Sequence, residues 1–209
     1  MCYTTPMRSS ARVGGAVALV ALFFGACSSS SPSKPTAVAR AAPFTSAELQ
    51  ARIVSKAPSG FVRQADDVGD TGPSDLAKAI RDGESGDGGK DLRAEGFVRG
   101  YQRLWIGPSH AQIIVFVNQF KSRVGARRNF ARATKGSESR PPPGVRKFPV
   151  TFLPAAQTIG AAGTDKNGSV AAIDFTSGVF TVQIVCNGPA LPGLQARALS
   201  VAETQYRRL

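Results

Sequence analysis

The sequence of this 209-residue chain predicts an α+β domain, with one antiparallel sheet and helices packed on one face of it. Three observations predict this class. β-Rich segments occur in pairs joined by short turn sequences, which favours antiparallel neighbours. A segment with apolar residues at helical spacing follows the pairs. Hydrophobic residues make up 42% of the chain, as in globular proteins. The order of these segments suggests two strand–strand–helix halves.

The first elements are short. A helix is expected to begin at Ser46, where the sequence is typical of a capped N-terminus, and to end near Lys56 because Pro58 follows. Residues 61–65 are expected to form a strand. The segment 73–76 opens a second short helix that runs through Ile80, and the glycine-rich stretch 82–89 is expected to be a loop.

The clearest hairpin follows. Residues 97–106 and 111–120 are β-rich, and the turn sequence Gly-Pro-Ser-His at 107–110 joins them. Ser122 is expected to cap a helix that runs to about Thr134. The Pro- and Gly-broken stretch 135–147 then connects to the second half.

The second half repeats the pattern. Residues 156–163 and 170–175 are expected to be extended, and Ser177-Gly178 turns the chain into a strand over 179–186. A final helix follows the prolines at 189–192, with apolar residues at helical spacing from Leu194 to Leu209. The domain is expected to span residues 44–209.

The charge of the chain is uneven. The formal net charge is +12, yet residues 65–96 hold nine acidic and four basic side chains. Residues 97–150 hold eleven basic side chains and one acidic one, so the basicity belongs to this central segment. A field of this sign favours polyanions and anionic membrane surfaces as partners.

The N-terminus predicts a signal peptide over residues 1–26. Arg8 and Arg12 are followed by fourteen uncharged residues, 13–26, most of them small or apolar. This apolar run is shorter than the ~20 residues of a spanning helix. The alternative is an ordinary signal cleaved near Ala39 or Ala41, which would release a secreted protein.

The segment Gly25-Ala26-Cys27 resembles the lipobox of bacterial lipoproteins, although Phe24 stands where that family usually has leucine. The Ala- and Arg-rich composition is similar to that of actinobacterial proteins. The resemblance implies that Cys27 becomes the first mature residue and carries diacylglycerol, which holds the protein on the outer face of the cytoplasmic membrane. Residues 27–43 are rich in serine and proline and are expected to be a flexible tether.

Cysteine usage predicts a domain without disulfides. Cys2 is lost with the leader and Cys27 takes the lipid, so Cys186 has no partner. Alternation places Cys186 on the apolar face of its strand, as a buried thiol. The alternative is a catalytic nucleophile, which would need a nearby base. His110, the one histidine of the chain, lies in an expected turn.

One strand face is a candidate ligand-binding surface. Arg99, Tyr101, Arg103 and Trp105 share one parity with Phe97, so they are expected to point to the same side. Aromatic rings interleaved with guanidinium groups suit anionic or sugar-like ligands. The opposite parity, which includes Val98, Leu104 and Ile106, could then supply the core. The alternative is that the aromatic residues are core and the arginine heads reach water.

The predicted helix after the hairpin has a cationic side. Arg128, Arg132 and Lys135 cluster opposite Ala126 and Phe130 at 100° per residue. Such a side suits anionic lipid headgroups. The alternative is an ordinary solvated face.

Enzymatic and metal-binding signatures fail residue by residue. Around Gly89-Lys90, Glu84 stands where a P-loop needs its first glycine and Asp91 where it needs a hydroxyl residue. The loop from Asp82 lacks the glycine of an EF-hand. There is no Gly-x-Ser-x-Gly segment, and one histidine with one free cysteine does not suit zinc. We therefore expect no catalytic residue, no cofactor and no metal.

These observations favour a membrane-anchored, non-enzymatic binding or accessory module. Its expected partner is an anionic envelope component: a lipid headgroup, a cell-wall polymer or an envelope protein. Nucleic acid suits the charge but is not expected for an exported chain. The alternative is an envelope hydrolase whose catalytic carboxylates come together only in the fold.

Overall fold

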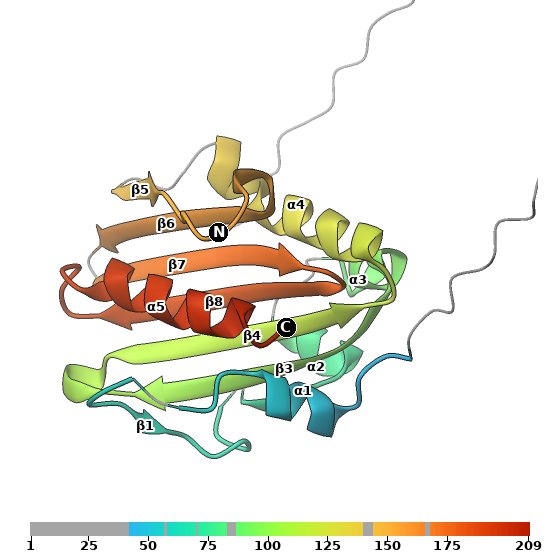
Figure 1. Ribbon diagram of the computed structural model, residues 1–209, viewed down its shortest axis with the longest axis horizontal. Coiled ribbons are helices and arrows are strands. Elements are labelled where there is room, and N and C mark those ends of the chain that lie inside the picture. The colour runs from blue at the N-terminus through green and yellow to red at the C-terminus, as the bar shows by residue number, and fades with distance from the viewer. Residues whose placement is uncertain (1–41, 57, 70, 83–86, 140–143, 166–167) are drawn as a thin grey trace, which may run out of the picture. The chain divides into compact units, whose positions relative to one another are not determined.

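A single open sheet organises the domain (Figure 1). The structure is a computed structural model, and it describes residues 42–56, 58–69, 71–82, 87–139, 144–165 and 168–209. The predicted signal peptide, Cys27 and the predicted tether up to Ala41 lie outside these residues. No helix within them is long and apolar enough to cross a membrane.

The sheet has eight strands, and every pairing is antiparallel. The order is β1-β3-β4-β8-β7-β6-β5, and β2 also pairs with β3. The α+β class and the antiparallel sheet are therefore confirmed. The strands are β1 (Val62–Arg63), β2 (Gly72–Ser74), β3 (Phe97–Ile106), β4 (Gln112–Phe120), β5 (Val145–Phe148), β6 (Thr158–Asp165), β7 (Gly168–Ser177) and β8 (Phe180–Gly188).

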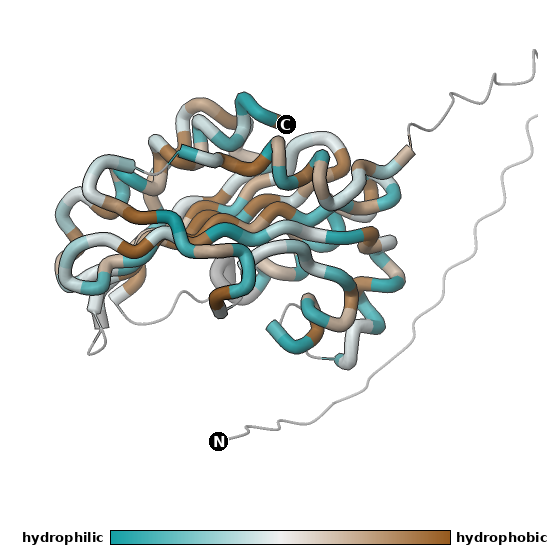
Figure 2. The backbone as a smooth tube through the Cα atoms, turned by 90° about the horizontal axis from the view of Figure 1, so that it is seen from below, coloured by the Kyte–Doolittle hydropathy of each residue, from teal (hydrophilic) through white to brown (hydrophobic). Residues whose placement is uncertain are grey.

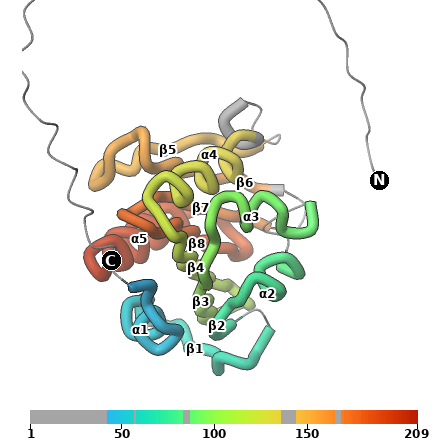
Figure 3. Tube along the Cα trace, turned by 90° about the vertical axis from the view of Figure 1, so that its right-hand side faces the viewer, coloured from blue at the N-terminus to red at the C-terminus, as the bar shows by residue number. Residues whose placement is uncertain are grey.

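Helices cover both faces of the sheet, which corrects the expectation of one covered face (Figure 3). On one side lie α1 (Ser46–Arg52) and α5 (Leu194–Tyr206), and on the other lie α2 (Leu76–Arg81), α3 (Lys90–Glu95) and α4 (Arg123–Ser139). Two short 3₁₀ turns, Pro108–His110 and Ala155–Gln157, complete the described helices. The physical reason is that β3 and β4 carry apolar side chains on both faces, so each face has surface to cover.

The main core lies between the sheet and helices α1 and α5. Alternate residues of the central strands are fully buried there, as Val115, Ile173 and Ile184 show. Ala198 and Val201 of α5 complete the layer. Figure 2 shows the resulting band of hydrophobic chain along the central strands.

Local chemistry explains the helix starts. Thr45 caps α1 in a capping box with Glu48, and the Asp75 carboxylate accepts a hydrogen bond from the backbone N–H of Lys78 at 2.8 Å to cap α2. Helix α1 begins at Ser46 as expected, and α2 begins at Leu76, the last residue of the segment expected to open it. However, α1 ends at Arg52 instead of near Lys56.

A β-bulge modifies the predicted hairpin. Phe97 pairs with Phe120 but Arg99 pairs with Gln119, so the register shifts between Phe97 and Arg99. The extra residue moves Phe97 to the opposite face from Arg99, and its ring packs edge-on against Phe120 with ring centroids 5.9 Å apart. The five predicted residues therefore do not all share one face.

The strand–strand–helix order does occur twice, as β3-β4-α4 and β7-β8-α5. β4 and β8 are antiparallel neighbours, so a two-fold axis that exchanged the two halves would have to run perpendicular to the sheet between them. Rotation about such an axis does not exchange the two faces of the sheet, so it would place α4 and α5 on the same face. Instead, α4 and α5 lie on opposite faces. The two halves are not related by such an axis.

Candidate ligand-binding cavity

A row of side chains crosses four adjacent strands on the face that α4 partly covers. The strand register places Gln102 opposite Phe116, Phe116 opposite Gln183, and Gln183 opposite Asp174. Cross-strand neighbours of this kind lie on the same face, with Cβ atoms about 5 Å apart. The next row toward α4 runs from Asn118 to Thr181.

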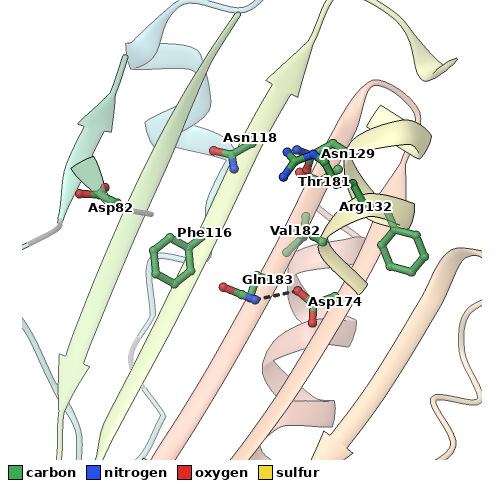
Figure 4. Close-up of a pocket in the computed structure, with 11 residues that line it drawn as sticks. Asp82, Phe116, Asn118, Asn129, Arg132, Asp174, Thr181, Val182 and Gln183 are labelled. Atoms are coloured by element: carbon green, nitrogen blue, oxygen red, sulfur yellow. Dashed lines mark hydrogen bonds between the residues drawn. The ribbon is translucent and has the colours of Figure 1, made fainter. Parts of the chain in front are cut away.

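Helix α4 closes one side of this row and forms a cavity of about 430 Å³ with it (Figure 4). This volume is within the range of small-molecule sites, about 300–1,000 Å³. In Figure 4 the ring of Phe116 lies between Asp82 and Gln183, and Asp174 is hydrogen-bonded to Gln183. The α4 residues that line the cavity are Asn129, Phe130, Arg132 and Ala133.

A buried carboxylate fixes α4 beside the cavity. Glu95 at the end of α3 accepts two hydrogen bonds from the Arg132 guanidinium, from Nε at 2.7 Å and from Nη2 at 2.9 Å. The amide of Asn129 donates to the same carboxylate at 2.9 Å. These hydrogen bonds raise the pKa of Arg132, which holds the guanidinium charged. The Arg132 charge is thus neutralised within the protein.

The carboxyl group of Asp174 lies on the cavity floor, and its pKa is raised. Its Oδ1 accepts a hydrogen bond from Gln183 Nε2 at 2.9 Å. Burial raises the pKa of Asp174 from 3.8 to about 6, and the Gln183 hydrogen bond opposes this rise only in part. Near pH 6 the carboxyl group is therefore partly protonated, so it can either donate or accept a hydrogen bond.

The second acidic residue of the cavity, Asp82, is held at the opposite side. Its carboxylate pairs with Lys78 Nζ at 2.7 Å and accepts a hydrogen bond from Gln102 Nε2 at 2.9 Å. Gln102 and Asp174 are three strand spacings apart, roughly 14 Å. The two carboxyl groups therefore stand at opposite ends of the row.

The predicted strand face is largely interior. Tyr101, Arg103 and Trp105 are at most 2% exposed, because α1 packs over them. The Arg103 guanidinium donates to the carbonyl oxygens of Ile53 at 3.1 Å and Val54 at 2.7 Å. This corrects the expectation of an exposed face at these three positions, and it also differs from the alternative in which the arginine heads reach water.

A hydrogen-bond network explains this burial. The Tyr101 hydroxyl donates to Asp66 at 2.6 Å, and Asp66 also pairs with Arg63 at 2.8 Å. Burial and the Asp66 hydrogen bond raise the pKa of Tyr101 to about 12. The side chains expected to contact a ligand therefore contact α1 and the loop after β1. Arg99 differs from the other three residues of the predicted face. It is half-buried, and it lines a surface cavity.

The predicted cationic side of α4 is divided. Arg128 and Lys135 are exposed, whereas Arg132 is half-buried in its pairing with Glu95 and also lies 3.6 Å from Asp91. The predicted cluster of three does not form a single outward surface. Arg127 is exposed beside Arg128.

Cys186 is fully buried, and its burial raises the pKa of the thiol to about 12. The thiol stays protonated at neutral pH, which suits the buried-thiol interpretation. Within the described part of the chain, no three histidine, cysteine, aspartate or glutamate side chains gather as a metal site.

Of the residues that line this cavity, the sequence predicted a role only for Arg132, and that role was a different one. One signal was present: Asp174 interrupts an otherwise apolar and small-residue strand between Ile173 and Phe175. Asn129, in the middle of α4, was a weaker signal of the same kind, since asparagine is unfavourable in helix interiors.

The fold and the cavity define an α+β domain with an open antiparallel sheet and a ligand-sized site on one face. The sequence matches no family model and no curated protein. Among solved structures, the chain is similar to the extracellular domain of PknH from Mycobacterium tuberculosis. The TM-score is 0.46 with 10% sequence identity, over 80% of this chain and 97% of that domain.

Proposed function

We propose that this chain is an exported, lipid-anchored binding module that holds an uncharged polar ligand in the cavity beside α4. One observation carries the proposal: amide and carboxyl groups face aromatic ring surface in a single cavity of ligand size. Sites of this composition orient a ligand through a few polar groups and gain affinity from the apolar walls.

The chemistry of the cavity favours a neutral ligand over the anionic one expected from sequence. Its guanidinium, from Arg132, is already paired with Glu95, and two of its remaining polar residues, Asp82 and Asp174, are acidic. Gln183 and Asp174 present amide and carboxyl groups next to the ring of Phe116. A sugar-like molecule, with hydroxyl or acetamido groups on one side and C–H groups on the other, has the complementary chemistry.

Titration calorimetry with a panel of neutral mono- and disaccharides, including N-acetylated hexosamines, tests this proposal. Replacement Gln183→Leu removes one polar partner and should weaken binding about fivefold, since a hydrogen bond contributes about 1 kcal/mol. The matched control is Gln112→Leu, on the same sheet face but outside the cavity. Equal affinities for the two variants, or no binding by the wild-type chain across the panel, would contradict the site.

The hydrolase alternative has one supporting observation, since two carboxyl groups line the cavity. However, each carboxyl group already has partners within the protein. Asp82 pairs with Lys78 and accepts a hydrogen bond from Gln102, whereas Asp174 accepts one from Gln183. These separate partners support binding over hydrolysis as the role of the two residues.

Export and anchoring form the other part of the proposal, and they rest on the leader and Cys27. Two acyl chains bury enough CH₂ groups, at about 0.8 kcal/mol each, for stable attachment. The intact mass of the membrane-extracted protein tests both processing and lipidation. A mature chain that begins after Cys27, or that lacks the mass of a diacylglycerol, would contradict the anchor.

A contact between the exposed side of α4 and anionic lipid is a further part of the proposal. Arg127 and Arg128 are exposed, and each basic residue near an anionic surface contributes about 1 kcal/mol. Co-sedimentation of the chain with vesicles at increasing salt measures this contribution. Replacing both arginines with glutamine should reduce the salt-dependent part of binding.

A further inference from the structure

A second cavity, separate from the first, lies where α1, α2 and β3 meet. It has a volume of about 440 Å³, and its lining differs in charge from that of the cavity beside α4. Two guanidinium groups and an ammonium group line it, from Arg81, Arg99 and Lys78. Its other polar lining residues are Ser46, Ser74 and Asp75.

The two arginines are the cations available to a ligand. Lys78 is committed to Asp82, with Nζ and Oδ2 2.7 Å apart. Within the described residues, no carboxylate lies within ion-pair distance of Arg81 or Arg99. Asp75 is occupied as the cap of α2. The cavity therefore has an excess of positive charge.

Arg99 carries an unmet hydrogen-bonding requirement. Its Nε–H is buried and has no acceptor among the described residues. A buried donor without a partner costs about 1–3 kcal/mol, more when the group is charged. The Arg99 side chain also lines the cavity, and guanidinium groups match phosphate oxygens in a forked geometry. An anion in the cavity would therefore give this guanidinium an acceptor that the described residues do not supply.

We propose that this cavity binds a phosphate group, through Arg81 and Arg99 with the hydroxyl groups of Ser46 and Ser74. The position of the cavity in the chain suits a lipid headgroup as one source. Ser46 is nineteen residues after Cys27, a stretch that spans at most ~65 Å, so an anchored domain can bring the cavity to the membrane surface. That last step rests on the proposed anchor, whereas phosphate binding itself does not.

The test is titration calorimetry on the full chain in a non-ionic detergent. The probes are inorganic phosphate, a short-chain phosphatidylglycerol and, as a zwitterionic comparison, a short-chain phosphatidylcholine. Binding of phosphate and phosphatidylglycerol alike would support a site for the phosphate group itself. Binding of phosphatidylglycerol alone would support a headgroup site. Absence of binding by both would overturn the proposal, whether or not Cys27 carries lipid.

Paired variants separate the cavity from general charge. Arg81→Gln combined with Arg99→Gln should weaken binding at least tenfold. The matched control, Arg123→Gln combined with Arg146→Gln, removes two exposed arginines outside this cavity and should change binding less than twofold. Equal losses in the two pairs would show a non-specific charge effect and overturn the site. Arg81 is exposed, so Arg81→Gln alone keeps the fold and should still weaken binding severalfold. Far-UV circular dichroism checks the folding of each variant.

Discussion

The Arg103 guanidinium donates a hydrogen bond to the carbonyl oxygen of Val54 at 2.7 Å, from the middle of β3 to the second residue after α1. A second bond reaches the carbonyl oxygen of Ile53 at 3.1 Å. The carbonyl groups at a helix C-terminus carry partial negative charge, so they stabilise a buried cation without a carboxylate. Gln205 of α5 donates to the Arg52 carbonyl oxygen and accepts from the Val54 N–H in the same place. These bonds end α1 at Arg52, four residues before the end expected from Pro58.

Replacement Arg103→Met should lower the free energy of unfolding by about 2–4 kcal/mol. Hydrogen bonds to a charged group contribute about 1.5–3 kcal/mol each, and the buried carbonyl groups of α1 would lose their donor. Urea unfolding followed by fluorescence of Trp105 measures the change. Arg128→Met, on the exposed side of α4, is the matched control and should change stability by less than about 0.5 kcal/mol. A variant more stable than the wild type would show that desolvation of Arg103 outweighs its hydrogen bonds.

The fold was predictable where local signals decide it. The β3–β4 hairpin was expected within one residue of its observed bounds, because its turn and its apolar runs are local features. The strands β2 and β5 were missed. β2 has three residues and contains Pro73, and β5 has four residues without period-2 alternation, two adjacent exposed basic residues between two half-buried ones. Short edge strands depend on a neighbour that the local sequence does not identify.

The faces of β3 were less predictable. Parity correctly grouped Arg99, Tyr101, Arg103 and Trp105, but it does not say which face meets the core. That depends on where α1 packs, which is a long-range contact. The first cavity was missed for the same reason: Asp174 and Gln183 come from β7 and β8, and the strand order that places them beside Phe116 of β4 is not encoded in any one segment.

The Glu95 carboxylate should be essential for the position of α4. Replacement Glu95→Ala removes the acceptor of Arg132 and Asn129 and should lower the free energy of unfolding by about 3 kcal/mol, because a half-buried cation loses its partner. Glu203→Ala is the matched control, since the exposed Glu203–Arg207 pair contributes at most about 1 kcal/mol. Thermal or urea unfolding of the two variants measures both effects. Equal losses would contradict the anchoring role of Glu95.

Cys186 should be inert in the folded protein. Its thiol is fully buried and has a pKa of about 12, so almost none of it is thiolate at pH 7.5. A colourless aromatic disulfide reagent that releases a coloured thiolate should label Cys186 only after denaturant is added. The control is the same reaction in 6 M guanidinium, where labelling should be complete. Stoichiometric labelling of Cys186 under native conditions within minutes would contradict its burial and reopen the nucleophile interpretation.

Asp174 should make the stability of the domain depend on pH between about 4 and 6. Its pKa is about 6 in the folded chain and about 3.9 in the unfolded chain, so between these values the folded state holds one more proton. Stability from this group is therefore highest below pH 4 and falls as the pH rises through 6, by roughly 3 kcal/mol in all.

The variant Asp174→Asn keeps the shape of the side chain and removes the titration. It should be more stable than the wild type by roughly 3 kcal/mol at pH 7.5, and the difference should shrink toward zero at pH 3.5. Urea unfolding of both proteins at several pH values measures the difference directly, so pH effects common to both cancel. A difference that stays constant from pH 3.5 to 7.5 would show that Asp174 titrates at its ordinary pKa. The cavity floor would then be as well hydrated as the surface, and the proposed ligand would gain little from displacing its water.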